Sequence, residues 1–246
     1  MKNFFGKIFA AWALLIFIVT LLLIVLPIWI IGIFPEPKRT ESFRRISIVW
    51  MRVFFFLSGC NLKISGRRNF KGDQNYIVVS NHNSFFDVPV LTPFIPRANK
   101  TIAKAELAKI PLFGLIYKRG SILLDRNDKK SRQDSFRKMK NVLAMGMDMC
   151  IYPEGTRNKT MMPLKEFHDG AFRLAVETET PIIPALIFNT KKILPSGKFF
   201  FWPGKIELHF LEPVEVKKED NFLDLKERIH QLMSNFYVTH SKSTFK

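Results

Sequence analysis

Two residues of complementary chemistry, His82 and Asp87, lie five positions apart directly after an apolar run, Tyr76 to Val79, that is typical of a buried strand. An imidazole can act as a general base, and a nearby carboxylate can fix its tautomer and stabilise its protonated form. In an unbroken helix the two side chains would diverge by roughly 140°, so the chain must turn between them. If the chain leaves the strand at Asn81 and enters a helix near Ser84, Asp87 can fold back onto His82.

The same residues also fit a simpler interpretation, a helix N-terminus capped by Asn83 or Ser84 with Asp87 favouring the helix dipole. The pair alone does not decide between the two, because a chain with 5 histidines supplies such pairs by chance. Metal binding by the pair is not expected, since no second cluster offers further ligands at the usual spacing. We interpret the remaining histidines as packing or surface residues: His168, His209, His230 and His240.

A second polar cluster, Glu154-Gly155-Thr156-Arg157, follows another strand-like run, Met149 to Tyr152. Gly155 lets the backbone approach a ligand closely, and Arg157 offers a planar fork that matches phosphate oxygens. Glu154 would repel a phosphate, so we expect it to fix an arginine through a buried ion pair. The alternative is a glycine turn with a surface salt bridge. A given tetrapeptide occurs by chance in a chain of this length roughly once in a thousand, so this cluster is the more specific signal.

From residue 59 onward, short apolar runs alternate with stretches of helical spacing, which predicts a single α/β domain with a largely parallel central sheet flanked by helices. The carboxyl ends of parallel strands meet at one edge of a sheet, where α/β proteins bind ligands. We therefore expect His82, Asp87 and Arg157 to share one cleft. The expected strands cover 62–64, 76–80, 121–124, 149–152, 182–188 and 206–211, and the expected helices include 136–143, 172–176 and 225–236.

The N-terminal segment is predicted to anchor the protein to a membrane. No residue from Ile8 to Phe34 is charged, and a helix of that length would reach about 40 Å, more than the roughly 30 Å hydrocarbon core of a bilayer. We assign 1–58 to this anchor and 59–246 to the α/β domain. Pro27 could bend the helix within one leaflet, so the sequence leaves open whether it spans the membrane or re-enters.

The stretch from Glu41 to Leu57 predicts a second helix of the anchor. It is apolar apart from Arg44, Arg45 and Arg52, which share one helical face. This pattern indicates a helix in the membrane interface with its arginines toward the head groups. Packing into the core of the α/β domain is the alternative.

The charge balance narrows the possible partners. Lys+Arg 38 against Asp+Glu 21 gives a net charge of +17, which favours an anionic partner such as lipid head groups, a phosphorylated substrate or nucleic acid. Basic residues are denser after the apolar helix than before it, which predicts that the α/β domain faces the cytoplasm. The 2 cysteines do not form a disulfide framework, in keeping with a reducing compartment.

Four blocks of the chain, in order, resemble the glycerolipid acyltransferases typified by 1-acylglycerol-3-phosphate (lysophosphatidic acid) acyltransferase. They are Asn81-His82 through Asp87, Gly120 to Arg126, Tyr152 to Arg157, and Pro181 to Pro184. The resemblance covers about 62–188, and the hydrophobic N-terminus is also similar to that of bacterial members, which implies the bacterial inner membrane. One departure is Phe167-His168-Asp169-Gly170, where the family commonly has Phe-Lys-x-Gly, with Lys165 three residues before His168 as a possible substitute.

The resemblance implies that His82 takes the proton from the sn-2 hydroxyl of lysophosphatidic acid, which then attacks an acyl thioester, and that Asp87 orients His82. The product would be phosphatidic acid, and the donor acyl-CoA or acyl carrier protein. No Gly-x-Ser-x-Gly motif occurs, which agrees with direct transfer. No cofactor or metal is expected. The expected phosphate-binding residues are Glu154, Gly155, Thr156, Arg157, Arg126 and Lys104.

Other acceptors remain open at this point: glycerol 3-phosphate, another lysophospholipid, or a lyso-ornithine lipid. A membrane-tethered protein that binds anions or nucleic acid is a more distant alternative, supported by the charge alone. The sequence contains no recognised nucleic-acid-binding module, so we expect membrane lipids and the two substrates, and not nucleic acid, as partners.

Overall fold

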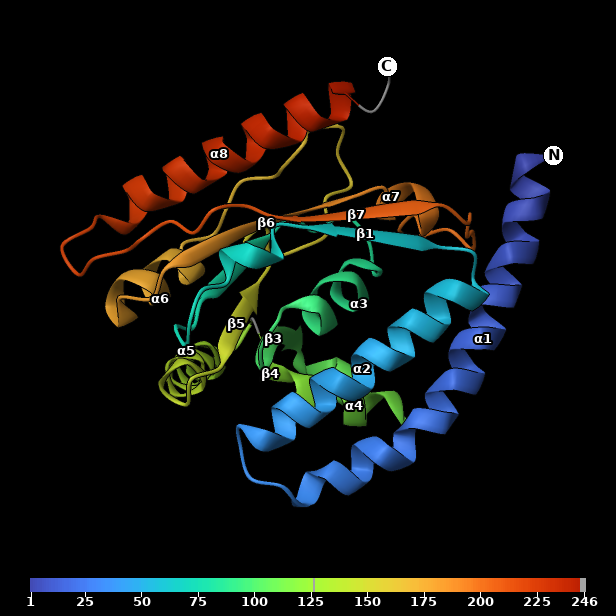
Figure 1. The fold of residues 1–246 in the computed structure, drawn as a ribbon, viewed down its shortest axis with the longest axis horizontal. Helices are drawn as coiled ribbons and strands as arrows, with labels where there is room; N and C mark the ends of the chain where they lie inside the picture. The colour runs from blue at the N-terminus through green and yellow to red at the C-terminus, as the bar shows by residue number, and fades with distance from the viewer. Residues whose placement is uncertain (126, 244–246) are drawn as a thin grey trace.

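The computed structural model describes residues 1–125 and 127–243, and Figure 1 shows it as a ribbon. A seven-stranded sheet has the strand order β1-β7-β6-β2-β5-β3-β4. The five strands from β6 to β4 are parallel, β7 is antiparallel to β6, and β1 is parallel to β7. The strands are β1 (Asn61–Ser65), β2 (Ile77–Ser80), β3 (Asn99–Lys104), β4 (Ser121–Leu124), β5 (Asp148–Ile151), β6 (Ile182–Phe188) and β7 (Lys205–Phe210).

The central strand β2 shows why the sheet is apolar. It pairs with β5 on one side and β6 on the other. Val78 packs into one hydrophobic cluster while Ile77 and Val79 pack into another, because successive side chains point to opposite faces. Helices cover both faces, so the strand is an uninterrupted apolar run rather than an alternating one.

The helices form two layers around the sheet (Figure 1). One layer contains the N-terminal pair and the helices next to the expected active site, and the other layer contains the C-terminal helix, drawn in red. The first consists of α1 (Lys2–Ile30), which continues into a short 3-10 turn (Ile31–Ile33), α2 (Lys38–Leu57), α3 (Asp87–Leu91), α4 (Phe113–Gly120) and α7 (Thr190–Ile193). The second consists of α5 (Lys129–Ala144), α6 (Gly170–Thr178) and α8 (Phe222–Ser243).

The two N-terminal helices pack against each other. The Trp50 indole N–H donates to Thr20 Oγ1 at 2.9 Å, and the Trp12 indole N–H donates to the Leu57 carbonyl at 3.0 Å. The Phe17 ring contacts both Trp50 and Phe113, the latter at the start of α4. Helix α1 is therefore attached to α2 and α4 rather than separate from the rest of the molecule.

Helix α2 belongs to the domain core on one side. Trp50, Met51, Phe54 and Phe55 are buried in the same hydrophobic cluster as Val78 of β2, as the alternative interpretation of this helix anticipated. The expectation that its arginines point outward is wrong for Arg44. That side chain is 11% exposed and donates to the Ile95 carbonyl at 3.2 Å, because its face of the helix packs against the chain that follows α3.

The predicted fold class is confirmed, and each predicted strand is present within one residue at each end. Strand β3 and helices α4 and α7 have no counterpart among the predicted elements, whereas α3 corresponds to the helix anticipated after His82. β3 carries four polar residues in six, and it forms because it pairs with β4 and β5 in the middle of that side of the sheet. Helix α5 begins where the Asp128 carboxylate accepts the backbone N–H groups of Lys130 and Ser131, an N-cap.

Candidate active site

Three polar segments follow the carboxyl ends of three adjacent parallel strands. His82 follows β2, Glu154 to Arg157 follow β5, and Thr190 follows β6. Asn81 ties two of these strand ends together, since its side-chain amide donates to the Ile187 carbonyl at 3.0 Å and its carbonyl accepts the Ile187 N–H at 2.8 Å. The sheet therefore brings distant parts of the sequence to one edge, as the topology predicts.

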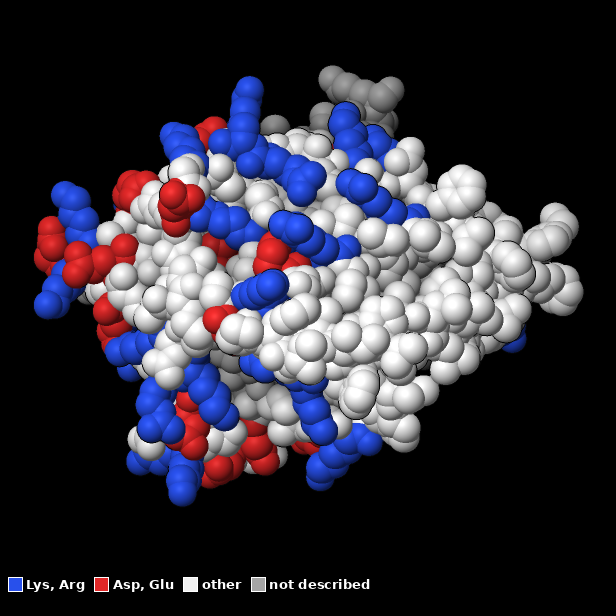
Figure 2. Space-filling view, turned by 60° about the horizontal axis from the view of Figure 1, so that its bottom comes forward, with Lys and Arg blue, Asp and Glu red and all other residues white. Residues whose placement is uncertain are grey.

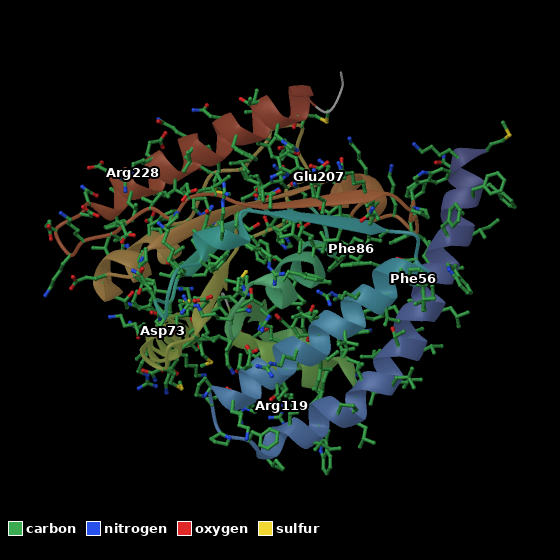
Figure 3. All side chains as sticks on the ribbon, viewed as in Figure 1. Phe56, Asp73, Phe86, Arg119, Glu207 and Arg228 are labelled. Atoms are coloured by element: carbon green, nitrogen blue, oxygen red, sulfur yellow. The ribbon has the colours of Figure 1, made fainter. Side chains whose placement is uncertain are left out.

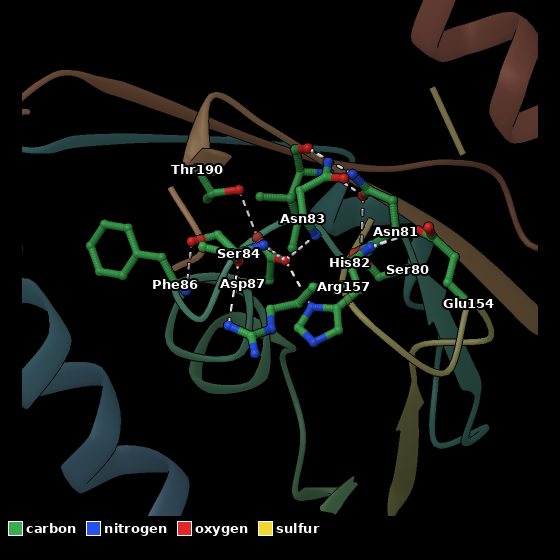
Figure 4. Close-up of polar contacts among 12 residues, drawn as sticks. Ser80, Asn81, His82, Asn83, Ser84, Phe86, Asp87, Glu154, Arg157 and Thr190 are labelled. Carbon is green, nitrogen blue, oxygen red and sulfur yellow. Dashed lines mark hydrogen bonds and ion pairs between the residues drawn. The ribbon is translucent and has the colours of Figure 1, made fainter. Parts of the chain in front are cut away.

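The predicted contact between His82 and Asp87 is present. His82 Nδ1 lies 2.8 Å from Asp87 Oδ2, and Figure 4 shows the two side chains facing each other across the turn. Asp87 is the first residue of α3, three residues later than the helix start anticipated near Ser84. The same Oδ2 accepts the backbone N–H groups of Asn83 at 2.5 Å and Ser84 at 2.7 Å, so the carboxylate shapes the turn that carries the histidine.

Asp87 is completely buried, and its second oxygen is also occupied. Thr190 Oγ1 donates to Asp87 Oδ1 at 2.6 Å. With both oxygens accepting hydrogen bonds, the carboxylate holds a proton on His82 Nδ1 and leaves Nε2 as the basic nitrogen. The His82 side chain is 19% exposed, so the imidazole is reached by solvent, and the Tyr152 ring packs against it with centroids 4.5 Å apart.

Glu154 has a different role from the one expected. Its carboxylate is buried and accepts the His82 backbone N–H at 2.8 Å and the Lys165 backbone N–H at 3.1 Å, rather than pairing with an arginine. Burial raises the pKa of Glu154 from 4.5 to about 7, against the lowering effect of those two hydrogen bonds. The Asn158 N–H donates to the His82 carbonyl at 2.6 Å. Residues 154–158 therefore hold both sides of the histidine backbone, and Glu154 supports the turn instead of facing a phosphate.

Arg157 lies at the same edge as His82. Its guanidinium carbon is 3.4 Å from the centroid of the Phe85 ring, and one of its nitrogens is 3.3 Å from Ser196 Oγ. Figure 4 draws the guanidinium and the His82 imidazole on the same side of the Asp87 turn. Within residues 1–125 and 127–243 no carboxylate forms an ion pair with Arg157. This half-buried cation is therefore suited to bind an anion beside the base.

Of the other residues predicted to bind phosphate, two lie next to Arg157 and one lies farther along the edge of the sheet. Gly155 has φ +67°, which glycine adopts readily and which turns the chain at the strand end. Thr156 is exposed, and its Oγ1 accepts a hydrogen bond from Lys165 Nζ at 2.6 Å. The Lys165 ammonium therefore reaches the segment from Glu154 to Arg157. Lys104 is the exposed last residue of β3, about 10 Å from β2 because one strand lies between them. Arg126 lies outside the described residues.

Some important residues had no signal in the sequence. Thr190 is 103 positions from Asp87 and lies outside every predicted strand and helix. Two of the histidines interpreted as packing or surface residues do pack among aromatic rings, but the sequence does not show that they meet each other. His209 and His240 contact each other with ring centroids 4.5 Å apart, because β7 and α8 bring them together.

The chain is similar to known acyltransferases. A family model described as "Acyltransferase" matches residues 61–188. A 1-acyl-sn-glycerol-3-phosphate acyltransferase from Helicobacter pylori is 32% identical over 192 residues, 78% of this chain and 80% of that one. The 1-acyl-sn-glycerol-3-phosphate acyltransferase alpha of Bos taurus is 29% identical over 209 residues, 81% of this chain and 70% of the relative.

A solved structure shares the fold. The crystal structure of the 1-acyl-sn-glycerophosphate (LPA) acyltransferase PlsC from Thermotoga maritima superposes with a TM-score of 0.78 at 24% sequence identity. The match covers 98% of this chain and 96% of that one, so the likeness extends beyond the α/β domain to the N-terminal helices.

Proposed function

The chain belongs to the acyltransferase family, and we propose that it transfers a fatty acyl group from a thioester donor to the sn-2 hydroxyl of 1-acyl-sn-glycerol 3-phosphate, giving phosphatidic acid. The donor is the thioester of coenzyme A or of acyl carrier protein. The observation that carries the proposal is the contact of the partly exposed His82 imidazole with the buried Asp87 carboxylate, beside the half-buried guanidinium of Arg157.

In the proposed reaction His82 Nε2 takes the proton of the acceptor hydroxyl as its oxygen attacks the thioester carbonyl. The new C–O bond forms, the C–S bond breaks, and the imidazolium returns the proton to the departing sulfur. Asp87 stabilises the imidazolium through the 2.8 Å contact with Nδ1. The acyl group passes directly between the substrates, so no resident cofactor takes part in this scheme.

The phosphate of the acceptor would bind where the structure gathers donors and positive charge. Arg157 provides a planar pair of N–H donors, and Gly155 allows close approach of the backbone. Thr156 and Lys165 lie next to each other at the rim of the same loop, and Lys165 takes the place of the lysine that the family commonly has three residues later. Lys104 supplies further positive charge from a neighbouring strand end.

The acceptor is a membrane lipid, and the apolar N-terminal helix fits a membrane anchor. Figure 2 shows a broad surface free of charged side chains, with Lys and Arg gathered around its borders. Exposed apolar residues of α1 include Leu23, Leu26 and Trp29, at 71%, 60% and 66% exposure. The opposite side of α1 is fixed to the domain, from the hydrogen bond of Gly6 with Phe201 to that of Thr20 with Trp50.

Because α1 is docked along much of its length, we propose that it lies within one leaflet with its exposed apolar side in the lipid, and that the domain rests on the cytoplasmic surface of the inner membrane. Basic side chains at the border of the apolar surface would then contact anionic head groups. This arrangement lets a lysolipid enter the cleft without leaving the membrane.

The direct experiment offers membranes carrying the protein a set of acceptors: lysophosphatidic acid, glycerol 3-phosphate, a neutral lysolipid and a lyso-ornithine lipid. Each is paired with acyl-CoA and with acylated acyl carrier protein, and products are identified by mass spectrometry. Phosphatidic acid formed from lysophosphatidic acid is the expected result. Acylation of another acceptor, with lysophosphatidic acid left unchanged, would contradict the proposed acceptor.

A further inference from the structure

Three side chains far from the acyl-transfer pair form a cluster of metal-binding atoms. Glu207 and His209 are two residues apart on β7 and therefore share one face of the sheet, the face covered by α8. His240, near the end of α8, completes the cluster, and one ligand atom from each residue lies within 4.8 Å of the other two. Figure 3 labels Glu207 on the side of the sheet that faces α8.

The Nε2 atoms of both histidines face the same carboxylate oxygen, Oε2 of Glu207. His209 Nε2 lies 3.3 Å from Glu207 Oε2, and His240 Nε2 lies 2.9 Å from it. The other carboxylate oxygen, Oε1, is 2.7 Å from Lys205 Nζ. One oxygen and two nitrogens thus converge, while the lysine occupies the oxygen that faces away from them.

We propose that Glu207, His209 and His240 bind a divalent transition metal ion of the zinc class, with Glu207 as a ligand through Oε2 and water in the fourth position. Two imidazoles and one carboxylate are a ligand set that Zn²⁺ favours. With bonds of about 2.0–2.1 Å, ligand atoms of a tetrahedral site lie about 3.3 Å apart. Both nitrogen–oxygen separations in the cluster are already close to that value. The two imidazole nitrogens lie within 4.8 Å of each other and would move to about the same separation on binding.

The surroundings of the cluster favour this arrangement. Ser65 Oγ lies 3.2 Å from His209 Nδ1, so it can hold the proton on that nitrogen and leave Nε2 free to bind a metal, the usual outer partner of a metal-bound histidine. The Glu207 side chain is only 5% exposed, whereas that of His240 is 24% exposed, which leaves a solvent-facing side for a water ligand. Lys205, 54% exposed, can move into solvent and reduce repulsion of the metal.

The position of the cluster indicates a structural role. Glu207 is the register partner of Phe188, the last residue of β6, and the Phe188 ring contacts both histidines and Tyr237. A bound ion would therefore fasten α8 to β7 behind the strand end that leads to Thr190. Metal binding should stabilise the folded state and the docking of α8, without contact with the reacting atoms.

Cobalt provides a direct test, because four-coordinate Co²⁺ has an intense visible absorption that Zn²⁺ removes on displacement. The full chain, purified in detergent and treated with a chelator, should bind one Co²⁺ per molecule with a Kd at or below about 1 μM and lose the signal when Zn²⁺ is added. Zn²⁺ should also raise the melting temperature. Binding of Co²⁺ only at millimolar concentration, or without the four-coordinate spectrum, would overturn the proposal.

Matched variants identify the ligands. His240→Ala and Glu207→Gln should each weaken binding by more than about a hundredfold, and Ser65→Ala, which removes only an outer partner, by about 10–100-fold. His230→Ala removes a histidine of the same helix outside the cluster and should bind as the wild type does. Each variant is first checked for its metal-free melting temperature. Unchanged Co²⁺ affinity in folded His240→Ala, or equal loss in His230→Ala, would show that the ion binds elsewhere.

Discussion

Thr190 is a positioning residue for the proposed base, because it is itself buried and its hydroxyl donates to the buried Asp87 carboxylate. Thr190→Val keeps the shape of the side chain and removes that hydrogen bond. We expect kcat to fall roughly tenfold, about 1.4 kcal/mol, with little change in the acceptor KM. Steady-state kinetics on purified protein measure both, and Thr190→Ser should restore most of the rate. A kcat equal to that of the wild type would exclude this role.

Arg157 is expected to act mainly on acceptor binding. Arg157→Ala removes the half-buried guanidinium that lies on Phe85, so the KM for lysophosphatidic acid should rise about tenfold or more, with a smaller effect on kcat. Arg157→Lys should recover only part of the affinity, since an ammonium lacks the planar pair of donors. A large fall in kcat at unchanged KM would instead assign Arg157 to the chemical step.

At the residue scale, contacts between residues close in the sequence could be predicted, and contacts between distant residues could not. His82 and Asp87 are joined by one short turn, so their spacing alone was enough to predict the contact. The sequence places Glu154 in a functional segment, but the expected arginine partner is wrong. Its carboxylate accepts the backbone N–H groups of His82 and Lys165, which no sequence pattern reveals. Thr190 was missed because only the folded sheet brings it to Asp87.

The exposed side of α1 should carry the attachment to lipid. Replacing both Leu23 and Leu26 with Asp places two charges on that side, and binding to vesicles that contain anionic lipid should fall about tenfold or more in a co-flotation experiment. The matched control, Leu223→Asp with Leu232→Asp, makes the same change on α8 in the opposite layer and should leave vesicle binding intact. Equal loss in both double variants would mean that α1 has no special part.

Strands that are continuous apolar runs could be predicted from the sequence, and a strand rich in polar residues could not. The apolar runs of β2 and β6 are buried on both faces, so their composition alone identified them. β3 contains Asn, Lys and Thr and alternates buried with partly buried positions, and its pairing with two neighbours makes it a strand. α2 satisfies two requirements at once, since it packs on the core through one side and carries exposed apolar residues on another.

The stability of the whole molecule should depend on pH through Asp148, which is fully buried at the start of β5. Burial raises the pKa of Asp148 from 3.8 to about 7, outweighing the hydrogen bond from the Tyr76 N–H. Between these two values the folded state keeps a proton that the unfolded chain has lost. The free energy of unfolding therefore falls as pH rises from about 4 to 7.

Asp148→Asn removes this titration while keeping the acceptor for Tyr76. The free energy of unfolding of the variant minus that of the wild type should be larger at pH 8 than at pH 4. The increase should be on the order of 1–4 kcal/mol. Denaturant unfolding of both proteins at the two pH values gives this difference directly, and because the raised pKa of Glu154 is common to both proteins, its effect cancels. A difference that does not change with pH would contradict the buried, proton-binding Asp148.

At the scale of the whole molecule, the order of the strands could not be predicted from the sequence. Alternation of strands and helices indicated a parallel sheet, but not that β2 would lie between β5 and β6, which is what places His82, Arg157 and Thr190 together. The same topology joins β7 to α8 and assembles the cluster of Glu207, His209 and His240, whose members looked unrelated along the chain.

The initial rate of acyl transfer by His82→Ala tests the central claim most directly. Wild type, His82→Ala and the control His230→Ala are compared at equal concentration in lipid micelles, with lysophosphatidic acid and either acyl-CoA or acylated acyl carrier protein. Equal melting temperatures are established first. The account predicts that His82→Ala loses at least about 10²–10⁴ in rate while His230→Ala retains it. Wild-type phosphatidic acid formation by folded His82→Ala would contradict the assignment of His82 as the base.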